Sequence, residues 1–187
     1  CKAANVYGAE SYIQGFSGYV CEILTIHYKG FLNLIKSASL WKGKVVIDPA
    51  GHWKGEDVMM QLNASKINSP LIVVDPVQKD RNASAALSQE NAGRFMQACK
   101  SFLKSPSIAF FKAQEFSKES LLAEAGKHAL IMVEISHFQG KKDVVGCQVA
   151  KAFEFMKEQF NAHGFRVIKG GFQLKPCISY FIIERKK

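Results

Sequence analysis

The sequence predicts an α+β fold in two domains, residues 1–112 and residues 113–187. Long stretches in which apolar residues recur every three or four positions indicate helices. Short β-branched runs, of which Leu71–Val74 is the clearest, indicate strands. A polar stretch at residues 112–120 (K-A-Q-E-F-S-K-E-S) separates the two sets of elements. With 187 residues and 48% hydrophobic content, the chain is long enough for one good core or two small ones.

The first domain is expected to be mainly helical with a small sheet. Ser17 stands where an N-cap would stand, and the apolar residues after it have the spacing of a helix face. Ser88 is expected to cap a second helix that ends at Pro106. The expected elements are an extended segment (1–16), a helix (18–37), strands (45–47, 58–62 and 71–74) and this second helix.

The second domain reads as strand, helix, strand, strand, which is the beginning of a ferredoxin-like β-α-β-β-α-β unit. The last helix and strand of that unit are missing, so we expect an incomplete sheet. The RNA-recognition module shares this topology, but its aromatic signature is absent from residues 128–135. The expected elements are a helical turn (120–125), a strand (128–135), a helix (145–163) with Gly164 after it, and strands (165–168 and 177–183) joined by a turn at 169–171.

The chain carries an excess of basic residues, with Lys+Arg 25 against Asp+Glu 16 and a formal net charge of +9. The excess is spread along the chain, because residues 1–112 hold 13 of the basic and 8 of the acidic residues. Many basic proteins bind nothing specific, so the charge alone decides little. It favours a polyanionic partner and a surface that follows a phosphate backbone.

The five cysteines are an odd number, with no C-x-x-C pair and no Cys/His ligand cluster. This usage predicts no metal site and indicates a reducing, cytoplasmic setting. No apolar run has the length of a membrane span, so no membrane partner is expected. The chain begins with Cys1 instead of methionine, which suggests an excised fragment or a processed product.

Two segments carry candidate binding residues. Gly15–Tyr19 contains the start of a predicted helix, and a helix start preceded by glycines presents free N–H groups that suit a phosphate. Asp75–Asn82 follows a predicted buried strand, and its Arg81 guanidinium is able to read base edges. Each segment also has a simpler interpretation, an ordinary helix cap and an ordinary turn. His52 and Trp53, in a turn between them, could stack on a base but more often such residues cover a core edge.

Four strings occur in order along the chain: V-Y-G-A-E (6–10), G-F-S-G-Y-V-C-E-I-L (15–24), V-V-D-P-V-x-K-x-R-N (73–82) and S-Q-E-N-A-G-R-F (88–95). With them the chain closely resembles the archaeal (class I) CCA-adding enzyme, a tRNA nucleotidyltransferase. The resemblance is strong to about residue 111 and weaker after that. It implies a central domain of the poly(A) polymerase and oligoadenylate synthetase substrate-binding type in residues 1–112. A ferredoxin-like C-terminal domain would follow in residues 113–187.

The resemblance implies that the incoming nucleotide is CTP or ATP and that its triphosphate is held at the helix start. The matching residues there are Tyr7, Ser17 and Gly18. Arg81 matches the arginine whose guanidinium helps to select cytosine and adenine over guanine and uracil.

Three further residues share the loop of Arg81. We expect Asp75 and Asn82 to orient this loop and not to touch the base. Gln78 stands where the family often has an acid, a departure that could alter how Arg81 is held.

The resemblance further implies addition of C, C and A to the tRNA 3′ end, with the tRNA acceptor stem as a partner. In the family, nucleotidyl transfer uses Mg²⁺ held by carboxylates of an N-terminal head, which carries a G-S motif followed by an acid-x-acid pair. No acid-x-acid pair occurs from Cys1 to Lys187, so we expect neither catalytic nor metal-binding residues in this chain. It should be inactive without the head. A homodimer is left open.

Two other functions fit the same residues. One is a stand-alone RNA-binding module without catalysis. The other is a related enzyme of the poly(A) polymerase type that shares the central fold. The D-P-V-x-x-x-R-N string favours the tRNA enzyme over the poly(A) polymerase type.

Overall fold

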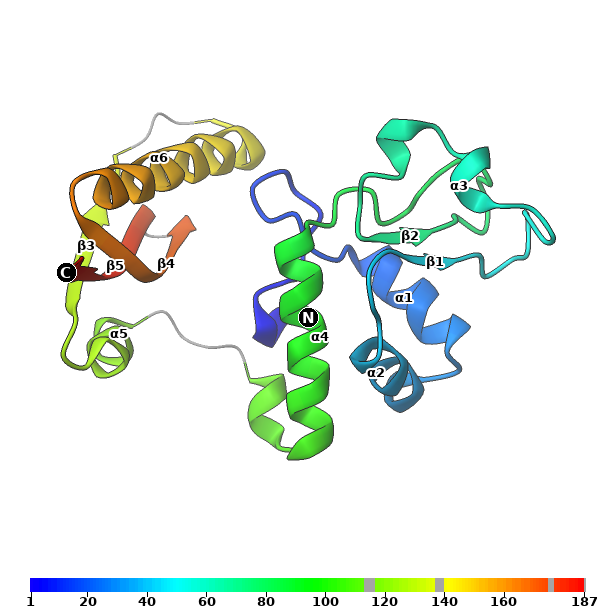
Figure 1. Ribbon diagram of the computed structural model, residues 1–187, viewed down its shortest axis with the longest axis horizontal. Coiled ribbons are helices and arrows are strands. Elements are labelled where there is room, and N and C mark those ends of the chain that lie inside the picture. The colour runs from blue at the N-terminus through cyan, green and yellow to red at the C-terminus, as the bar shows by residue number, and fades with distance from the viewer. Residues whose placement is uncertain (113–116, 137–139, 175–176, 187) are drawn as a thin grey trace. The chain divides into compact units, whose positions relative to one another are not determined.

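The computed structural model describes residues 1–112, 117–136, 140–174 and 177–186. The chain forms two compact units, Cys1–Ala113 and Gln114–Lys187 (Figure 1). Each unit combines helices with a small sheet and has its own apolar clusters, so the predicted α+β class is confirmed. Part of the polar stretch predicted as the boundary, residues 113–116, lies outside the described residues.

The first unit has a two-stranded parallel sheet with helices on both sides. In the sheet, Val45, Val46 and Ile47 pair with Leu71, Ile72 and Val73 in that order. Both strands were predicted, and so was the long helix capped by Ser88. The elements are η1 (Lys2–Ala4), α1 (Gly18–His27), α2 (Phe31–Ser39), β1 (Val45–Ile47), α3 (Val58–Gln61), η2 (Ala64–Lys66), β2 (Leu71–Val73), α4 (Gln89–Lys104) and η3 (Ile108–Phe111).

Strand β2 lies at the centre of this unit and is buried on both faces. Side chains alternate between the two faces of a strand. Leu71 and Val73 join the cluster formed with α1, α2 and α4, whereas Ile72 and Val74 join a smaller cluster with α3. Figure 1 shows α1 and α2 on one side of the strands and α3 on the other. Packing from both sides fixes the end of β2, where Asp75 follows.

The helix predicted from Gly18 to Ser37 is wrong in one respect, because the chain forms two helices there. Helix α1 ends at His27, and α2 begins after Gly30, which has φ 123° and ψ 167°. This conformation is open almost only to glycine. Apolar residues continue on both sides of the break, so their spacing did not reveal it.

The strand predicted at residues 58–62 is also wrong, since residues 58–61 form the short helix α3. The Asp57 carboxylate accepts a hydrogen bond from the Met59 N–H at 2.9 Å. This cap stabilises a helical turn. Val58 and Leu62 then lie on the same side and pack against β2.

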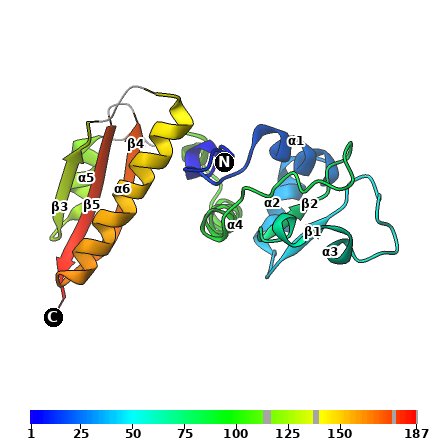
Figure 2. The same cartoon turned by 90° about the horizontal axis from the view of Figure 1, so that it is seen from above.

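The second unit is a three-stranded antiparallel sheet in the order β3-β5-β4. The third strand lies between the first two, as in the first half of the predicted ferredoxin-like unit. Helix α6 covers one face through Val149 and Phe153, and Figure 2 shows α5 on the opposite face. The elements are α5 (Lys118–Ala125), β3 (Ala129–Glu134), α6 (Lys142–Ala162), β4 (Phe165–Leu174) and β5 (Cys177–Arg185).

The turn predicted at residues 169–171 is wrong, because these residues lie within β4. The ladder has an irregularity between Val167 and Lys169 and then continues through both glycines. A Cβ on Gly170 would lie 3.0 Å from the ring of Phe153. This glycine therefore serves the close approach of α6 to the sheet and not a reversal of the chain. None of the helices in the described segments combines the length and the apolar character needed to cross a bilayer.

We expect Gly30→Ala to lower the free energy of unfolding of the first unit by about 1–3 kcal/mol, because alanine is strained at this backbone conformation. Gly93→Ala is the matched control. Gly93 lies within α4, and a Cβ there would meet nothing within 4 Å, so this change should raise stability by about 0.5–1 kcal/mol. Urea unfolding followed by tryptophan fluorescence measures both, since Trp41 and Trp53 belong to the first unit. Equal effects of the two substitutions would contradict this explanation of the helix break.

Candidate functional site

The buried carboxylate of Asp75, two residues after the end of β2, is the centre of the candidate site. Its side chain is 2% exposed. Oδ1 accepts hydrogen bonds from the N–H groups of Val77 at 2.8 Å and Gln78 at 3.2 Å and from the Tyr19 hydroxyl at 3.0 Å. Oδ2 accepts from Nη1 of Arg81 at 3.0 Å. One carboxylate thus connects the loop backbone, the arginine and the first turn of α1.

The same contacts set the ionisation of the site. Burial by itself raises the pKa of Asp75, but the two backbone N–H groups, the Tyr19 hydroxyl and the Arg81 charge outweigh it, and the pKa is lowered. The hydrogen bond to Asp75, with burial and the nearby negative charge, raises the pKa of Tyr19. At neutral pH the carboxylate is therefore ionised and the phenol remains a donor.

The start of α1 forms the other part of the site. Ser17 is the N-cap, as predicted, and its Oγ accepts from the Val20 N–H at 3.1 Å. A Cβ on Gly18 would lie 3.1 Å from the hydroxyl oxygen of Tyr7, so this tyrosine lies over the first turn. Tyr7 also forms a parallel bridge with Phe16 and is 41% exposed. Three predicted residues, Tyr7, Ser17 and Gly18, therefore lie together.

Tyr19 joins the two predicted segments, although it was not among the predicted site residues. It follows Gly18 in the first turn of α1, and its hydroxyl reaches Asp75, 56 positions away in the sequence. The side chain is 39% exposed, so part of it remains accessible to solvent. Its place in the G-F-S-G-Y string was the one signal that could have identified it.

Asn82 is directed into the protein. It is 3% exposed, and its Oδ1 accepts from the N–H groups of Val73 and Ser84 at 3.0 and 2.9 Å. Its Nδ2 donates to the Lys66 carbonyl at 2.7 Å. These contacts fix the return of the loop beside β2 and use both ends of the amide.

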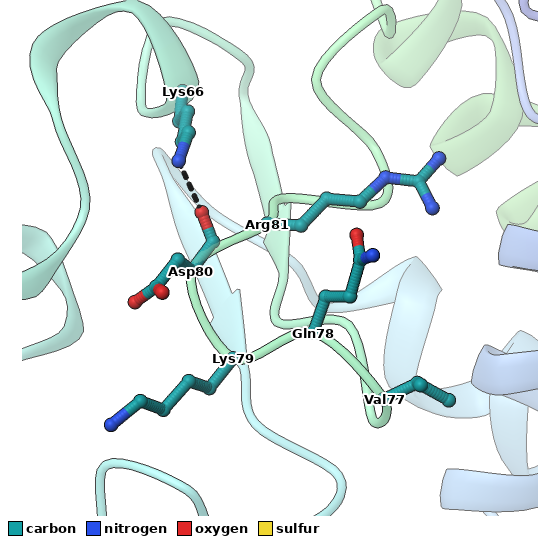
Figure 3. Close-up of a pocket in the computed structure, with 6 residues that line it drawn as sticks. All are labelled: Lys66, Val77, Gln78, Lys79, Asp80 and Arg81. Carbon is teal, nitrogen blue, oxygen red and sulfur yellow. Dashed lines mark hydrogen bonds between the residues drawn. The ribbon is translucent and has the colours of Figure 1, made fainter.

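A shallow pocket lies on the loop that carries Arg81. Figure 3 shows its six lining residues and the Lys66 ammonium donating to the Asp80 carbonyl. The side chains of Lys79 and Arg81 leave the loop in different directions. Tyr7, Ser17 and Gly18 are not among the lining residues, which are Lys66, Val77, Gln78, Lys79, Asp80 and Arg81.

Among the described residues, Asp75 is the one side chain that pairs with the Arg81 guanidinium. Nη1 is paired with Asp75, and the side chain is still 56% exposed. A guanidinium has five N–H donors, so most of them remain directed away from the carboxylate. Asp75 thus holds the arginine, and Gln78 lines the same pocket (Figure 3).

Metal binding was predicted to lie outside this chain. Within the described ranges, no three His, Cys, Asp or Glu side chains come close enough together to hold a metal ion. Asp75 is already engaged with four donors. The described residues therefore do not fit a Mg²⁺ site built on paired carboxylates.

Comparison with known proteins identifies the family. The family model described as tRNA nucleotidyltransferase, second domain, matches residues 1–112. The chain belongs to this family. The match covers α1, β2 and the loop of Arg81, so the candidate site lies within the matched domain.

Similar curated proteins of archaea are named CCA-adding enzymes. The one from Nanoarchaeum equitans is 54% identical over 91 residues, 48% of this chain and 23% of the relative. Those from Thermococcus gammatolerans and Archaeoglobus fulgidus are 36% and 32% identical over 89% and 98% of this chain. They confirm the resemblance to archaeal CCA-adding enzymes. The chain spans 40% or less of the length of these three relatives.

We expect Asp75→Asn to lower the free energy of unfolding at pH 7 by about 2–3 kcal/mol, because charged hydrogen bonds in a buried site are lost. The lowered pKa means that this stabilisation is fully present above the ordinary carboxyl pKa of about 4 and is lost as the pH falls through the folded-state pKa. The difference in the free energy of unfolding between the wild type and Asp75→Asn should therefore become smaller below about pH 4. Urea unfolding across this pH range measures it.

Asp80→Asn is the control, because Asp80 lies in the same loop with an exposed side chain. Its effect should stay within about 0.5 kcal/mol at every pH. A pH-independent difference for Asp75→Asn would show that the carboxylate charge does not stabilise the site.

Proposed function

We propose that this chain is the nucleotide- and tRNA-positioning part of a CCA-adding tRNA nucleotidyltransferase. Such an enzyme adds C, C and A to the tRNA 3′ end from CTP and ATP. Residues 1–112 would position the nucleotide, and residues 113–187 would form the C-terminal domain of ferredoxin-like type. The carboxylates that hold Mg²⁺ would lie on a separate catalytic head. The observation that carries the proposal is the Tyr19–Asp75–Arg81 connection, which ties a helix start to a guanidinium.

The triphosphate would bind at the start of α1. The first N–H groups of a helix have no acceptor within the helix, and the dipole makes this end positive. Ser17 accepts from one of these N–H groups, that of Val20, and the N–H groups of Gly18 and Tyr19 in the same turn would face the phosphate. The Tyr7 hydroxyl beside Gly18 adds a side-chain donor at the same place. Together these donors suit a phosphate.

The base would be read by Arg81. Arginine has donors and no acceptor, so it pairs with ring nitrogens that carry a lone pair. Cytosine N3 and adenine N1 are acceptors of this kind, whereas guanine N1 and uracil N3 carry hydrogens. Because Oδ2 of Asp75 accepts from Nη1, the remaining donors of the guanidinium are available on the side away from the carboxylate. This chemistry supports selection of CTP and ATP over GTP and UTP.

The tRNA would be attracted by positive charge. The formal net charge is +9, with basic residues in both units. Neutralising phosphates with lysine and arginine releases counterions and gives affinity that falls with salt. The charge supports a tRNA partner, and the base-selecting pocket separates this function from that of a simple RNA-binding module.

The test combines this chain with a separately expressed head, tRNA that lacks its 3′ CCA end, CTP, ATP and Mg²⁺. We expect Arg81→Ala to lower kcat/KM for CTP roughly 10- to 100-fold, the size of one well-placed base contact. Arg94→Ala is the matched control, since Arg94 is exposed on α4 and paired only with Glu90 among the contacts of the described residues. It should change kcat/KM less than about twofold. The wild type, Arg81→Ala and Arg94→Ala could instead bind RNA equally well and add no nucleotide. That result would favour the stand-alone RNA-binding module.

A further inference from the structure

The loop that carries Arg81 is held from its outer side by a second set of contacts. We call residues 76–81 the arginine loop. Asp75 and Tyr19 hold its inner side, as described above. On the outer side, three side-chain donors from residues 52–66 engage three backbone carbonyls of the loop. The pairs are His52 Nε2 with Pro76 O at 2.9 Å, Trp53 Nε1 with Lys79 O at 3.1 Å, and Lys66 Nζ with Asp80 O at 2.5 Å.

Trp53 connects the loop to the rest of the unit in several ways. Besides the indole hydrogen bond, its ring lies 4.8 Å from the Lys79 ammonium, a cation–π distance. Its backbone N–H donates to Oδ2 of Asp48 at 2.8 Å, directly after β1. The ring also packs against the cluster of Val58, Leu62, Ile72 and Val74. Trp53 therefore ties the arginine loop to the α3 side of the sheet.

These contacts bear on Arg81 because the loop is short and internally bonded. The Asp75 N–H donates to the Arg81 carbonyl at 2.9 Å, and the Arg81 N–H donates to the Gln78 carbonyl at 2.9 Å. Fixing Lys79 from outside thus limits where the Arg81 backbone lies. Within the described part of the chain the guanidinium has one anchor, Asp75, so the direction of its other donors follows the backbone. A binding group must be held within about 0.5 Å to act selectively.

We propose that Trp53, supported by His52, is a positioning residue that sets the base selectivity of Arg81. The proposal rests on the proposed function of the site. In this proposal Trp53 acts through the loop and not on the nucleotide, since its indole N–H donates to the Lys79 carbonyl and the Lys79 ammonium lies over one face of its ring. A stacking role for the same residue predicts a different result, because a phenylalanine would still stack on a base.

The first measurement is amide hydrogen exchange on the 187-residue chain, without nucleotide. Trp53→Phe keeps an aromatic ring and removes the indole donor, so exchange of the Asp75 and Arg81 N–H groups should become about 10-fold faster. Trp41→Phe is the matched control. Trp41 is also half-buried in the first unit, but its Nε1 donates to the Tyr28 hydroxyl at 3.3 Å, away from the loop. It should leave the exchange of these two N–H groups unchanged.

The second measurement is incorporation of CTP against UTP by the chain combined with the head. Trp53→Phe should lower the ratio of kcat/KM for CTP to kcat/KM for UTP about 5- to 30-fold. For CTP, the change should appear in KM, and kcat should change little. His52→Ala should lower the same ratio by a smaller factor, and His52 is exposed, so this variant avoids a folding defect. Trp41→Phe should retain the wild-type ratio.

The outcomes separate the two proposals. A wild type that does not prefer CTP over UTP would reject the nucleotide site itself. A selective wild type whose ratio and amide exchange are retained in Trp53→Phe would overturn only the positioning role. Faster exchange with a retained ratio would overturn it too, because the loop would then move without consequence for the base.

Discussion

The first unit depends on one buried charge. The Asp75 carboxylate is almost fully removed from solvent, and a charge in such a place is tolerated only when it is paired and hydrogen-bonded. Four donors meet this requirement, and they come from three parts of the chain: the loop backbone, Arg81 and Tyr19 on α1. Satisfying the carboxylate thus forces the helix start and the arginine to the same end of β2. The candidate site is a consequence of this requirement.

The core explains why that end of β2 is a fixed point. Leu71 and Val73 are buried against one set of helices, and Ile72 and Val74 against α3. A strand packed on both faces cannot shift by one residue without placing its side chains on the wrong faces. Asp75 is the next residue, so the packing of the strand determines where the carboxylate lies. Stability and site geometry therefore share the same residues.

The sequence predicted the features that depend on neighbouring residues. Caps at Ser17 and Ser88 and the strands predicted at 45–47 and 71–74 follow from local signals. The structure confirms them, with the second strand ending at Val73. The break at Gly30 was missed because a single glycine conformation interrupts a pattern of apolar residues that continues beyond it. The contact of Tyr19 with Asp75 joins residues 56 apart, and only tertiary packing brings them together. The close approach of Phe153 to Gly170 also arises from tertiary packing, so the sequence did not reveal it.

Under the proposed function, a rigid loop is a chemical necessity. One site must accept both cytosine and adenine, which differ in size and share an acceptor nitrogen on the pairing edge. A mobile guanidinium would find acceptors on any base, because guanine and uracil also carry carbonyl oxygens. Only an arginine that is unable to follow those oxygens can reject them. Contacts with Asp75 on the inner side of the loop and with Trp53 on the outer side oppose that movement from both directions. Selectivity for two bases then comes from restricting one side chain and not from adding contacts to either base.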